Sequence, residues 1–131
     1  MGVVVREERA VLEIQRKGTK VAEVIYSTHV CVDSISPSHD SKVRKQIMSF
    51  QEDDCNVTIE SIKLNEGEDL YYVFINLNQF LRSSGYSKMG IYVLESERKK
   101  YEELGFTTLT YIQETNGRFM VKKINLWEDS N

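Results

Sequence analysis

Apolar residues recur with two different periods along the chain, and each period predicts a different kind of element. Six segments show either period-two alternation or a β-branched, apolar and aromatic content, and both are typical of strands. These predicted strands cover residues 10–16, 21–32, 55–64, 88–94, 106–113 and 119–126. Apolar spacings of three and four residues predict helices over 41–50 and 70–82, and a charged third helix is predicted over 95–104.

The segment CNVTIESIKL changes its pattern midway. Its two apolar pairs have opposite parity, Val57 with Ile59 and then Ile62 with Leu64. One extra residue near Glu60 would return both pairs to the same face, and a β-bulge supplies such a residue. A strand buried on both faces is the alternative, because parity carries little meaning there.

Residues with capping chemistry mark where the predicted helices begin and end. Asp40 or Ser41 can cap the first helix and Asp69 the second, because their side-chain oxygens accept hydrogen bonds from free backbone N–H groups. Gly85 and Gly105 follow the second and third helices, where a left-handed residue commonly closes a helix. The sequence therefore predicts definite ends for the helical segments.

Two short turns join neighbouring predicted strands. The glycine of KGTK, residues 17–20, predicts a turn between the first two strands. The dipeptide Asn116–Gly117 predicts a type I′ hairpin turn between the last two strands, with positive φ at both central residues.

The order of the predicted elements indicates an α/β (α+β) fold with a mixed, mostly antiparallel sheet covered by helices. Hairpins at both ends flank a central strand–helix–strand unit made of residues 55–64, 70–82 and 88–94. This unit is predicted to be a right-handed parallel crossover. We expect residues 1–131 to form a single domain, which their number allows.

The charge and hydropathy of the chain exclude several partners. A net charge of −3 provides no basic surface, so nucleic acid is not an expected partner. The sequence contains no apolar run of about 18 residues, so no membrane association is expected. The stretch MGVVVREERA lacks the apolar region of a signal peptide, which together with the cysteine usage indicates a cytoplasmic protein.

The cysteines and histidines indicate neither a metal site nor a nucleophile. Cys31 and Cys55 have no CxxC spacing and are expected to be reduced, part-buried thiols. His29 and His39 are ten residues apart and cannot form a metal site by themselves. The chain also contains no Gly-x-Ser-x-Gly elbow, HExxH motif or Walker loop.

Four consecutive pieces of the second half occur in a characteristic order: VTIESIKL, NEGED, LYYVFINLNQFLRSSGYSKMGIYVL and ERKKYEELGFTTLTY. They resemble the strand, phosphate loop, long helix with following strand, and Tyr-Glu-x-Leu-Gly-Phe signature of the GCN5-related N-acetyltransferase (GNAT) family. The match covers residues 55–113. The first hairpin resembles the second and third strands of that family, whereas residues 33–54 have no counterpart.

The resemblance implies an acyl-CoA N-acyltransferase-like fold. It implies that acetyl-CoA lies between strands 55–64 and 88–94, with an amine, on a small molecule or a protein, as acceptor. The amine needs a base and the leaving thiolate needs an acid. By its position in the signature Tyr101 would be the acid, and Glu60 matches a place where some members have a glutamate base; His29 is a base by chemistry alone. The implied cofactor contacts are Ile62, Leu64, Gly67, Asp69 and Leu70.

The loop NEGED departs from the family, whose phosphate loop is basic and rich in glycine. It contains one glycine and no arginine or lysine, and Glu66, Glu68 and Asp69 add negative charge. An acidic first turn stabilises a helix but repels a polyanion. Three hypotheses therefore stay open: an acetyl-CoA-dependent enzyme, a non-catalytic domain of the same fold that binds a protein or ligand, and an unrelated α+β interaction protein. A homodimer through a sheet edge is a further expectation.

Overall fold

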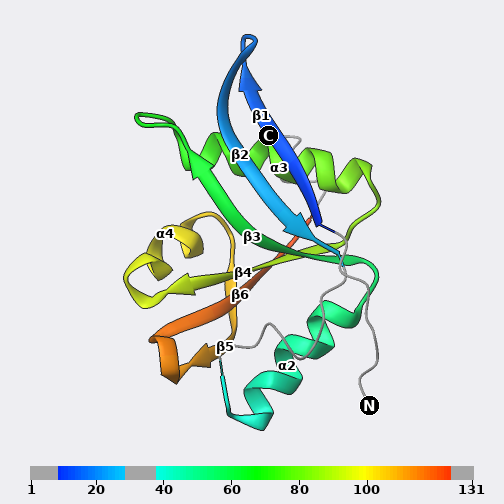
Figure 1. The fold of residues 1–131 in the computed structure, drawn as a ribbon, viewed down its shortest axis with the longest axis vertical. Coiled ribbons are helices and arrows are strands. Elements are labelled where there is room, and N and C mark those ends of the chain that lie inside the picture. The colour runs from blue at the N-terminus through cyan, green and yellow to red at the C-terminus, as the bar shows by residue number, and fades with distance from the viewer. Residues whose placement is uncertain (1–8, 29–37, 125–131) are drawn as a thin grey trace.

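In the computed structural model, residues 9–28 and 38–124 are described (Figure 1). All six predicted strands and all three predicted helices are present within these ranges. The elements are β1 (Arg9–Arg16), β2 (Thr19–Ser27), α2 (Ser41–Glu52), β3 (Asn56–Leu64), α3 (Leu70–Ser83), β4 (Lys88–Leu94), the 3₁₀ turn η1 (Glu95–Glu97), α4 (Arg98–Glu103), β5 (Thr107–Ile112), the 3₁₀ turn η2 (Gln113–Thr115) and β6 (Gly117–Lys123).

The strands form one six-stranded sheet in the order β1-β2-β3-β4-β6-β5. Every neighbouring pair is antiparallel except β3 and β4, which are parallel and are connected through α3. The predicted mixed sheet with a central parallel crossover is therefore confirmed.

The predicted β-bulge lies in β3 at Glu60. On the neighbouring β2, Tyr26 pairs with Ile59 and Ile25 pairs with Ser61, so Glu60 is the extra residue. The bulge restores the apolar face: Ile59 is buried in the core, and Ile62 packs against the same core after the bulge. The parity change in the sequence therefore has the cause that was predicted for it.

The bulge coincides with the point at which β3 and β4 separate. The two strands pair over four residues each, Asn56–Ile59 with Lys88–Ile91, and no further pair joins them within the described residues. Beyond that point β3 stays paired with β2 as far as Leu64, and β4 stays paired with β6 as far as Leu94. Figure 1 shows the two strands pointing in different directions after their common part.

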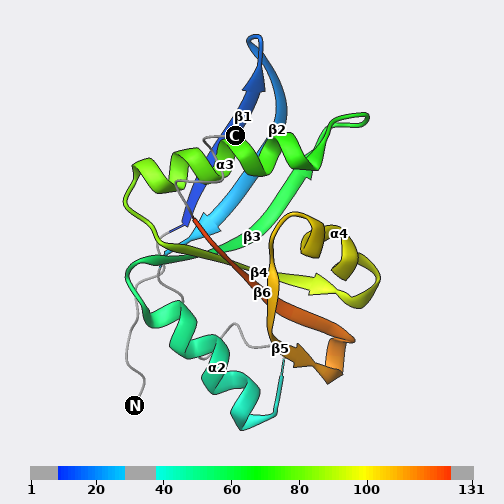
Figure 2. The ribbon, with the colours of Figure 1, turned by 180° about the vertical axis from the view of Figure 1, so that it is seen from behind.

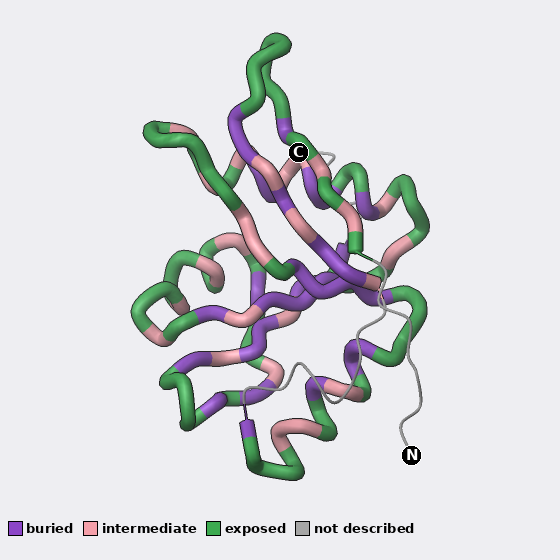
Figure 3. Tube along the Cα trace, viewed as in Figure 1, coloured by how far each residue is buried: buried purple, intermediate pink, exposed green. Residues whose placement is uncertain are grey.

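Helices cover both faces of the sheet, and each face has its own apolar cluster. The larger cluster joins the sheet to α3, where Val73, Leu77 and Leu81 are fully buried. Figure 2 shows α3 lying across β1 and β2. The smaller cluster joins α2 to β5 and β6 through Ile47, Phe50, Ile112 and Phe119. The buried segments follow the sheet and the inner sides of the helices (Figure 3).

Capping residues fix the helices as predicted. The Asp40 carboxylate accepts from the N–H groups of Lys42 and Val43 at the start of α2. At the end of α3, Gly85 is left-handed, with φ of 91°. The Tyr86 N–H then bonds to Leu81 O at 3.0 Å, which closes the helix with a Schellman motif.

The last hairpin, between β5 and β6, is confirmed, but its turn type was predicted wrongly. Asn116 is left-handed, with φ of 49°, but Gly117 does not have positive φ and already belongs to β6. The connection is therefore the η2 turn followed by one left-handed residue and not a type I′ turn. Gly117 is required for a different reason, because a Cβ there would lie 2.8 Å from the Val93 carbonyl oxygen.

Smaller differences concern segment ends and one thiol. The helix predicted over 95–104 begins with the η1 turn, so its α-helical part is shorter. Cys55 is free but exposed, and its predicted partial burial was wrong. Residues 29–32 and 125–126 of two predicted strands, together with His29 and Cys31, lie outside the described residues. No helix in the described ranges combines the length and apolarity needed to cross a membrane.

Candidate functional site

The separation of β3 and β4 leaves two strand edges without a ladder partner on one side. These edges are residues 60–64 and 92–94, and we call the space between them the strand gap. Backbone N–H and C=O groups along such edges can pair with an extended ligand as another strand would. Two of the predicted cofactor contacts, Ile62 and Leu64, lie on the β3 edge; Ile62 is half-buried and Leu64 is exposed.

Glu60, the predicted base, lies in the bulge at the point where the gap opens. Its carboxylate accepts a hydrogen bond from Arg9 Nε of β1 at 2.8 Å. A base must accept a proton from the reacting amine, so the amine would have to displace or share this guanidinium contact. The residue is therefore well positioned along the chain, but its carboxylate already has a cationic partner.

Tyr101, the predicted acid, lies on α4 and packs against the α3 side of the sheet. Its ring makes edge-to-face contacts with Phe74 and Phe106, at centroid distances of 5.9 and 5.7 Å. Burial, together with the nearby Glu97 carboxylate, raises the pKa of the Tyr101 phenol. A raised pKa keeps the hydroxyl protonated near neutral pH, as a proton donor requires, and no described residue hydrogen-bonds to that hydroxyl.

An ion-pair network fixes the segment that begins α4. The Glu95 carboxylate accepts from Arg118 Nε at 2.7 Å and from Arg98 Nε at 2.8 Å. Arg98 also donates to Glu102 at 3.0 Å. Hydrogen bonds from Arg118, with a smaller contribution from Arg98, lower the pKa of Glu95. The network therefore connects β6 to the helix that carries Tyr101.

The loop at residues 65–69, between β3 and α3, is a tight turn. The Glu68 N–H bonds to Asn65 O at 3.1 Å, and Gly67 between them has φ of 81°. Asn65 is held against β2 by its side-chain amide, which donates to Lys20 O at 2.8 Å. Gly67, a predicted cofactor contact, has no heavy atom within 4 Å of an added Cβ, so its role here is to provide the left-handed conformation of the turn.

The start of α3 does not fit the diphosphate of acetyl-CoA. The Asp69 carboxylate accepts from the Tyr71 N–H at 2.9 Å, which uses one of the backbone donors that an anion would need. Leu70, the last predicted cofactor contact, is half-buried against the core. The only basic side chain that contacts this loop within the described residues is Arg16, which pairs with Glu68 at 3.2 Å.

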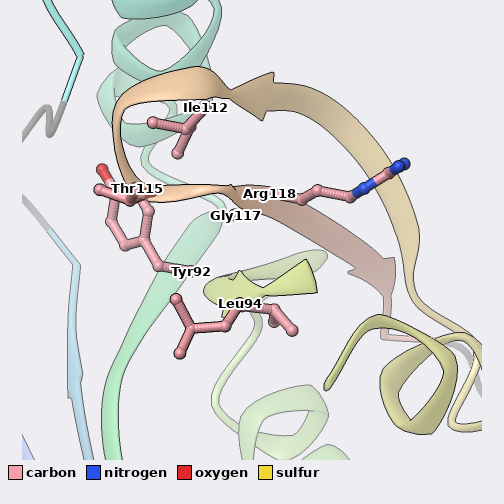
Figure 4. Close-up of a pocket in the computed structure, with 7 residues that line it drawn as sticks. Tyr92, Leu94, Ile112, Thr115, Gly117 and Arg118 are labelled. Carbon is pink, nitrogen blue, oxygen red and sulfur yellow. The ribbon is translucent and has the colours of Figure 1, made fainter. Parts of the chain in front are cut away.

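A cavity of about 270 Å³ lies where β4 ends beside the β5–β6 hairpin, and the sequence did not predict it. In Figure 4, Leu94 lies on the β4 side of the cavity and Ile112 on the β5–β6 side, while the Arg118 side chain points away. We call this space the β4 cavity. It is lined by Tyr92, Val93, Leu94, Ile112, Thr115, Gly117 and Arg118.

The β4 cavity opens on the α2 face of the sheet. Tyr92 and Ile112 both belong to the apolar cluster under α2, whereas Val93 faces the α3 side. Burial raises the pKa of Tyr92 to about 12, and a hydrogen bond with the Gln51 side chain opposes this shift. Leu94 is 58% exposed and presents apolar surface at the end of β4. The cavity is therefore a mainly apolar hollow with a neutral phenol in its wall.

The loop beside the cavity is attached to the start of α2. The Glu114 carboxylate accepts from the His39 N–H at 2.7 Å and from the Ser38 hydroxyl at 3.1 Å. The hydrogen bond from the His39 backbone is the main reason why the pKa of Glu114 is lowered. Because Thr115 follows directly, this contact also positions one wall of the β4 cavity.

Comparison with known proteins identifies the fold. No protein-family model and no curated protein sequence matches the chain. Among solved structures, AAC(6′)-Ib with paromomycin and acetyl-CoA has a TM-score of 0.62 at 12% identity, covering 94% of this chain and 69% of that one. FeeM, an N-acyl amino acid synthase from uncultured soil microbes, has a TM-score of 0.60 at 9% identity, covering 91% and 74%.

The GNAT domain of PAT from S. lividans has a TM-score of 0.54 at 12% identity, covering 88% of this chain and 60% of that one. Such identities establish the fold alone. The chain therefore has the GNAT fold in divergent form, as the signature YEELGF and its neighbours indicated.

Proposed function

We propose that this protein is an N-acyltransferase whose acyl donor, a thioester, lies in the strand gap and whose acceptor, an amine, lies in the β4 cavity. The observation that supports this most strongly is that residues 92–94 border both spaces. A donor paired along the β4 edge and an acceptor in the cavity would thus be neighbours. Solved proteins of this fold include complexes with acetyl-CoA and with coenzyme A, which supports a thioester donor.

The reaction needs one bond formed and one broken. The amine nitrogen attacks the thioester carbonyl, a C–N bond forms, and the C–S bond breaks to release a thiolate. A base removes one proton from the nitrogen, and an acid delivers one proton to the sulfur. The products, an amide and a thiol, therefore carry the same total charge as the reactants, and no oxidant is needed. We assign the acid role to Tyr101, whose half-buried phenol is protonated at neutral pH, and the base role to Glu60, which lies where the gap begins.

The acceptor suggested by the β4 cavity is a small amine with an apolar body. Tyr92, Leu94 and Ile112 provide apolar surface in the cavity wall, and none of the described residues that line it carries a carboxylate. A strongly cationic acceptor such as a polyamine would lack a counter-charge within this wall. An aryl or alkyl amine, neutral at the moment of attack, suits the lining better.

Hydrogen exchange with mass spectrometry tests the donor site directly. Binding of S-acetylpantetheine, the thioester arm without a nucleotide, should slow amide exchange in residues 60–64 and 92–94 and leave β1 unaffected. A ligand at 100 times its Kd should also stabilise the fold by about 2.7 kcal/mol. Thiol release with a panel of apolar amines then measures turnover. If neither strand edge is protected and no thiol is released, the proposed function is wrong.

A second candidate is a non-catalytic domain that binds a ligand in the same gap. The acidic, capped start of α3 favours it, because Asp69 uses one of the backbone donors that an acyl-CoA-dependent enzyme would need. The two candidates differ in turnover: this one predicts protection of the strand edges without any release of thiol from the acyl donor.

A further inference from the structure

We infer that the donor site of this protein accepts a thioester on a pantetheine-type arm and excludes the diphosphate of coenzyme A. This inference rests on the proposed function, because it specifies the class of donor for that same site. It follows from a contrast between two adjacent parts of the molecule, namely the neutral strand edges of the gap and the acidic turn at residues 65–69.

The first part of the argument concerns hydrogen-bond donors. The Tyr71 N–H at the start of α3 bonds to the Asp69 carboxylate at 2.9 Å, and the Glu68 N–H bonds to Asn65 O at 3.1 Å. A diphosphate would have to displace the Asp69 carboxylate, which is covalently attached and already at its optimal distance. Helix capping and anion binding compete here for the same backbone group.

The second part concerns charge. Glu66, Glu68 and Asp69 place three carboxylates within four residues, and the Arg16 guanidinium, 3.2 Å from Glu68, is the cation that contacts them in the described structure. Arg16 is further held over the Tyr72 ring, 4.1 Å from its centroid. In water, one carboxylate about 6 Å from one phosphate charge weakens binding about threefold. Three carboxylates facing the two charges of a diphosphate weaken binding further, because each additional pair of like charges adds repulsion.

The strand gap has no such obstacle for the arm itself. Pantetheine carries two amide groups and no charge, so it can lie between β3 and β4 in a strand-like way beyond the point where their own ladder ends. Neutral amides are unaffected by the carboxylates of the neighbouring turn. The site therefore discriminates between two ligands that share the same thioester and differ only in the nucleotide.

Calorimetric titration of the whole chain with S-acetylpantetheine and with acetyl-CoA tests the inference. We expect acetyl-CoA to bind no more tightly than S-acetylpantetheine. We also expect its affinity to rise between about 10 and 150 mM salt, because a shorter screening length weakens repulsion. The affinity for S-acetylpantetheine should not change with salt. The salt series uses the unaltered protein, so it does not depend on how a variant folds.

The triple variant Glu66→Gln, Glu68→Gln and Asp69→Asn removes the charge while keeping a capping side chain at position 69. It should bind acetyl-CoA about tenfold or more tightly than the unaltered protein and S-acetylpantetheine equally well. Glu52→Gln, on exposed α2 surface away from the gap, is the matched control and should change neither affinity.

The outcomes separate the two proposals. If the unaltered protein binds acetyl-CoA about tenfold or more tightly than S-acetylpantetheine, and more tightly at low salt, the exclusion of the diphosphate is wrong while the proposed function stands. If neither thioester binds at any salt concentration, both proposals are wrong. If S-acetylpantetheine binds at least as well as acetyl-CoA, and the triple variant reverses that order, the inference is supported.

Discussion

Gly90 in β4 provides the sharpest test of how α2 is attached to the sheet. An added Cβ at this position would lie 2.5 Å from Phe119 Cζ and 2.8 Å from Phe50 Cε1. The two rings form an edge-to-face pair with centroids 5.4 Å apart and are part of the cluster that joins α2 to β5 and β6. Gly90→Ala therefore inserts a methyl group where two buried rings already meet.

The expected cost follows from these distances. Phe119 would have to move by roughly 1 Å to regain ordinary van der Waals contact, and overpacking of this kind costs about 1–3 kcal/mol. Gly90 does not have positive φ, so alanine fits its backbone and reduces the entropy of the unfolded chain, which offsets about 0.4–1 kcal/mol. The net loss is about 1–2 kcal/mol, or a melting temperature lower by about 4–8 °C for a domain of this size.

Urea unfolding followed by circular dichroism measures this loss, and a double-mutant cycle assigns its cause. Phe119→Leu removes the ring atoms nearest to the new methyl group, so Gly90→Ala should cost at least about 0.5 kcal/mol less in that background. An unchanged or increased stability of the single variant would refute the proposed packing. Strict additivity of the two substitutions would show that the Phe119 ring is not the source of the cost.

Three further substitutions test other parts of the molecule. Asp69→Ala should lower the free energy of unfolding by about 1 kcal/mol because the Tyr71 N–H loses its acceptor, whereas Asp69→Asn should be nearly neutral in the same urea titration. The pKa of Glu114 is lower in the folded protein than in the unfolded chain, so ionised Glu114 stabilises the fold. This stabilisation is complete above the unfolded pKa and is lost as the pH falls through the folded pKa. Glu114→Gln should therefore flatten the acid limb of a profile of stability against pH. If Tyr101 is the acid, Tyr101→Phe should reduce turnover about 100-fold in a thiol-release assay, without changing donor affinity or melting temperature, and equal turnover would exclude that role.

The fold could be predicted because local signals and long-range packing agree along most of the chain. The parity change around Glu60 is the clearest case, since an inserted residue moves the following side chains to the other face and leaves that change visible in the sequence. Asp69 and Gly85 fixed the ends of α3 in the same way, through hydrogen bonds that a short sequence stretch determines. Such features depend on neighbours within a few residues, and the sequence displays those neighbours directly.

The β4 cavity and the last turn could not be predicted because both depend on distant segments. Gly117 is selected by the approach of the Val93 carbonyl, so the Asn-Gly dipeptide was mistaken for a local turn signal. The cavity combines the end of β4 with the β5–β6 hairpin, and Leu94 on its wall looks in the sequence like an ordinary core residue. Charge pairs such as Glu95 with Arg118 likewise join residues 23 positions apart.

The acidic turn and the strand gap together indicate how this version of the fold differs from one that binds a nucleotide. A capping side chain that accepts from an N–H group at a helix start leaves fewer of these groups for a ligand. Here the Asp69 carboxylate accepts from Tyr71, and Glu68 occupies Arg16, so the local chemistry stabilises α3 at the expense of anion binding. The strand gap coincides with the extra residue Glu60 in β3, and it does not depend on how the start of α3 is capped. Loss of a phosphate site therefore need not imply loss of the thioester site, which is why the two must be tested with ligands that separate them.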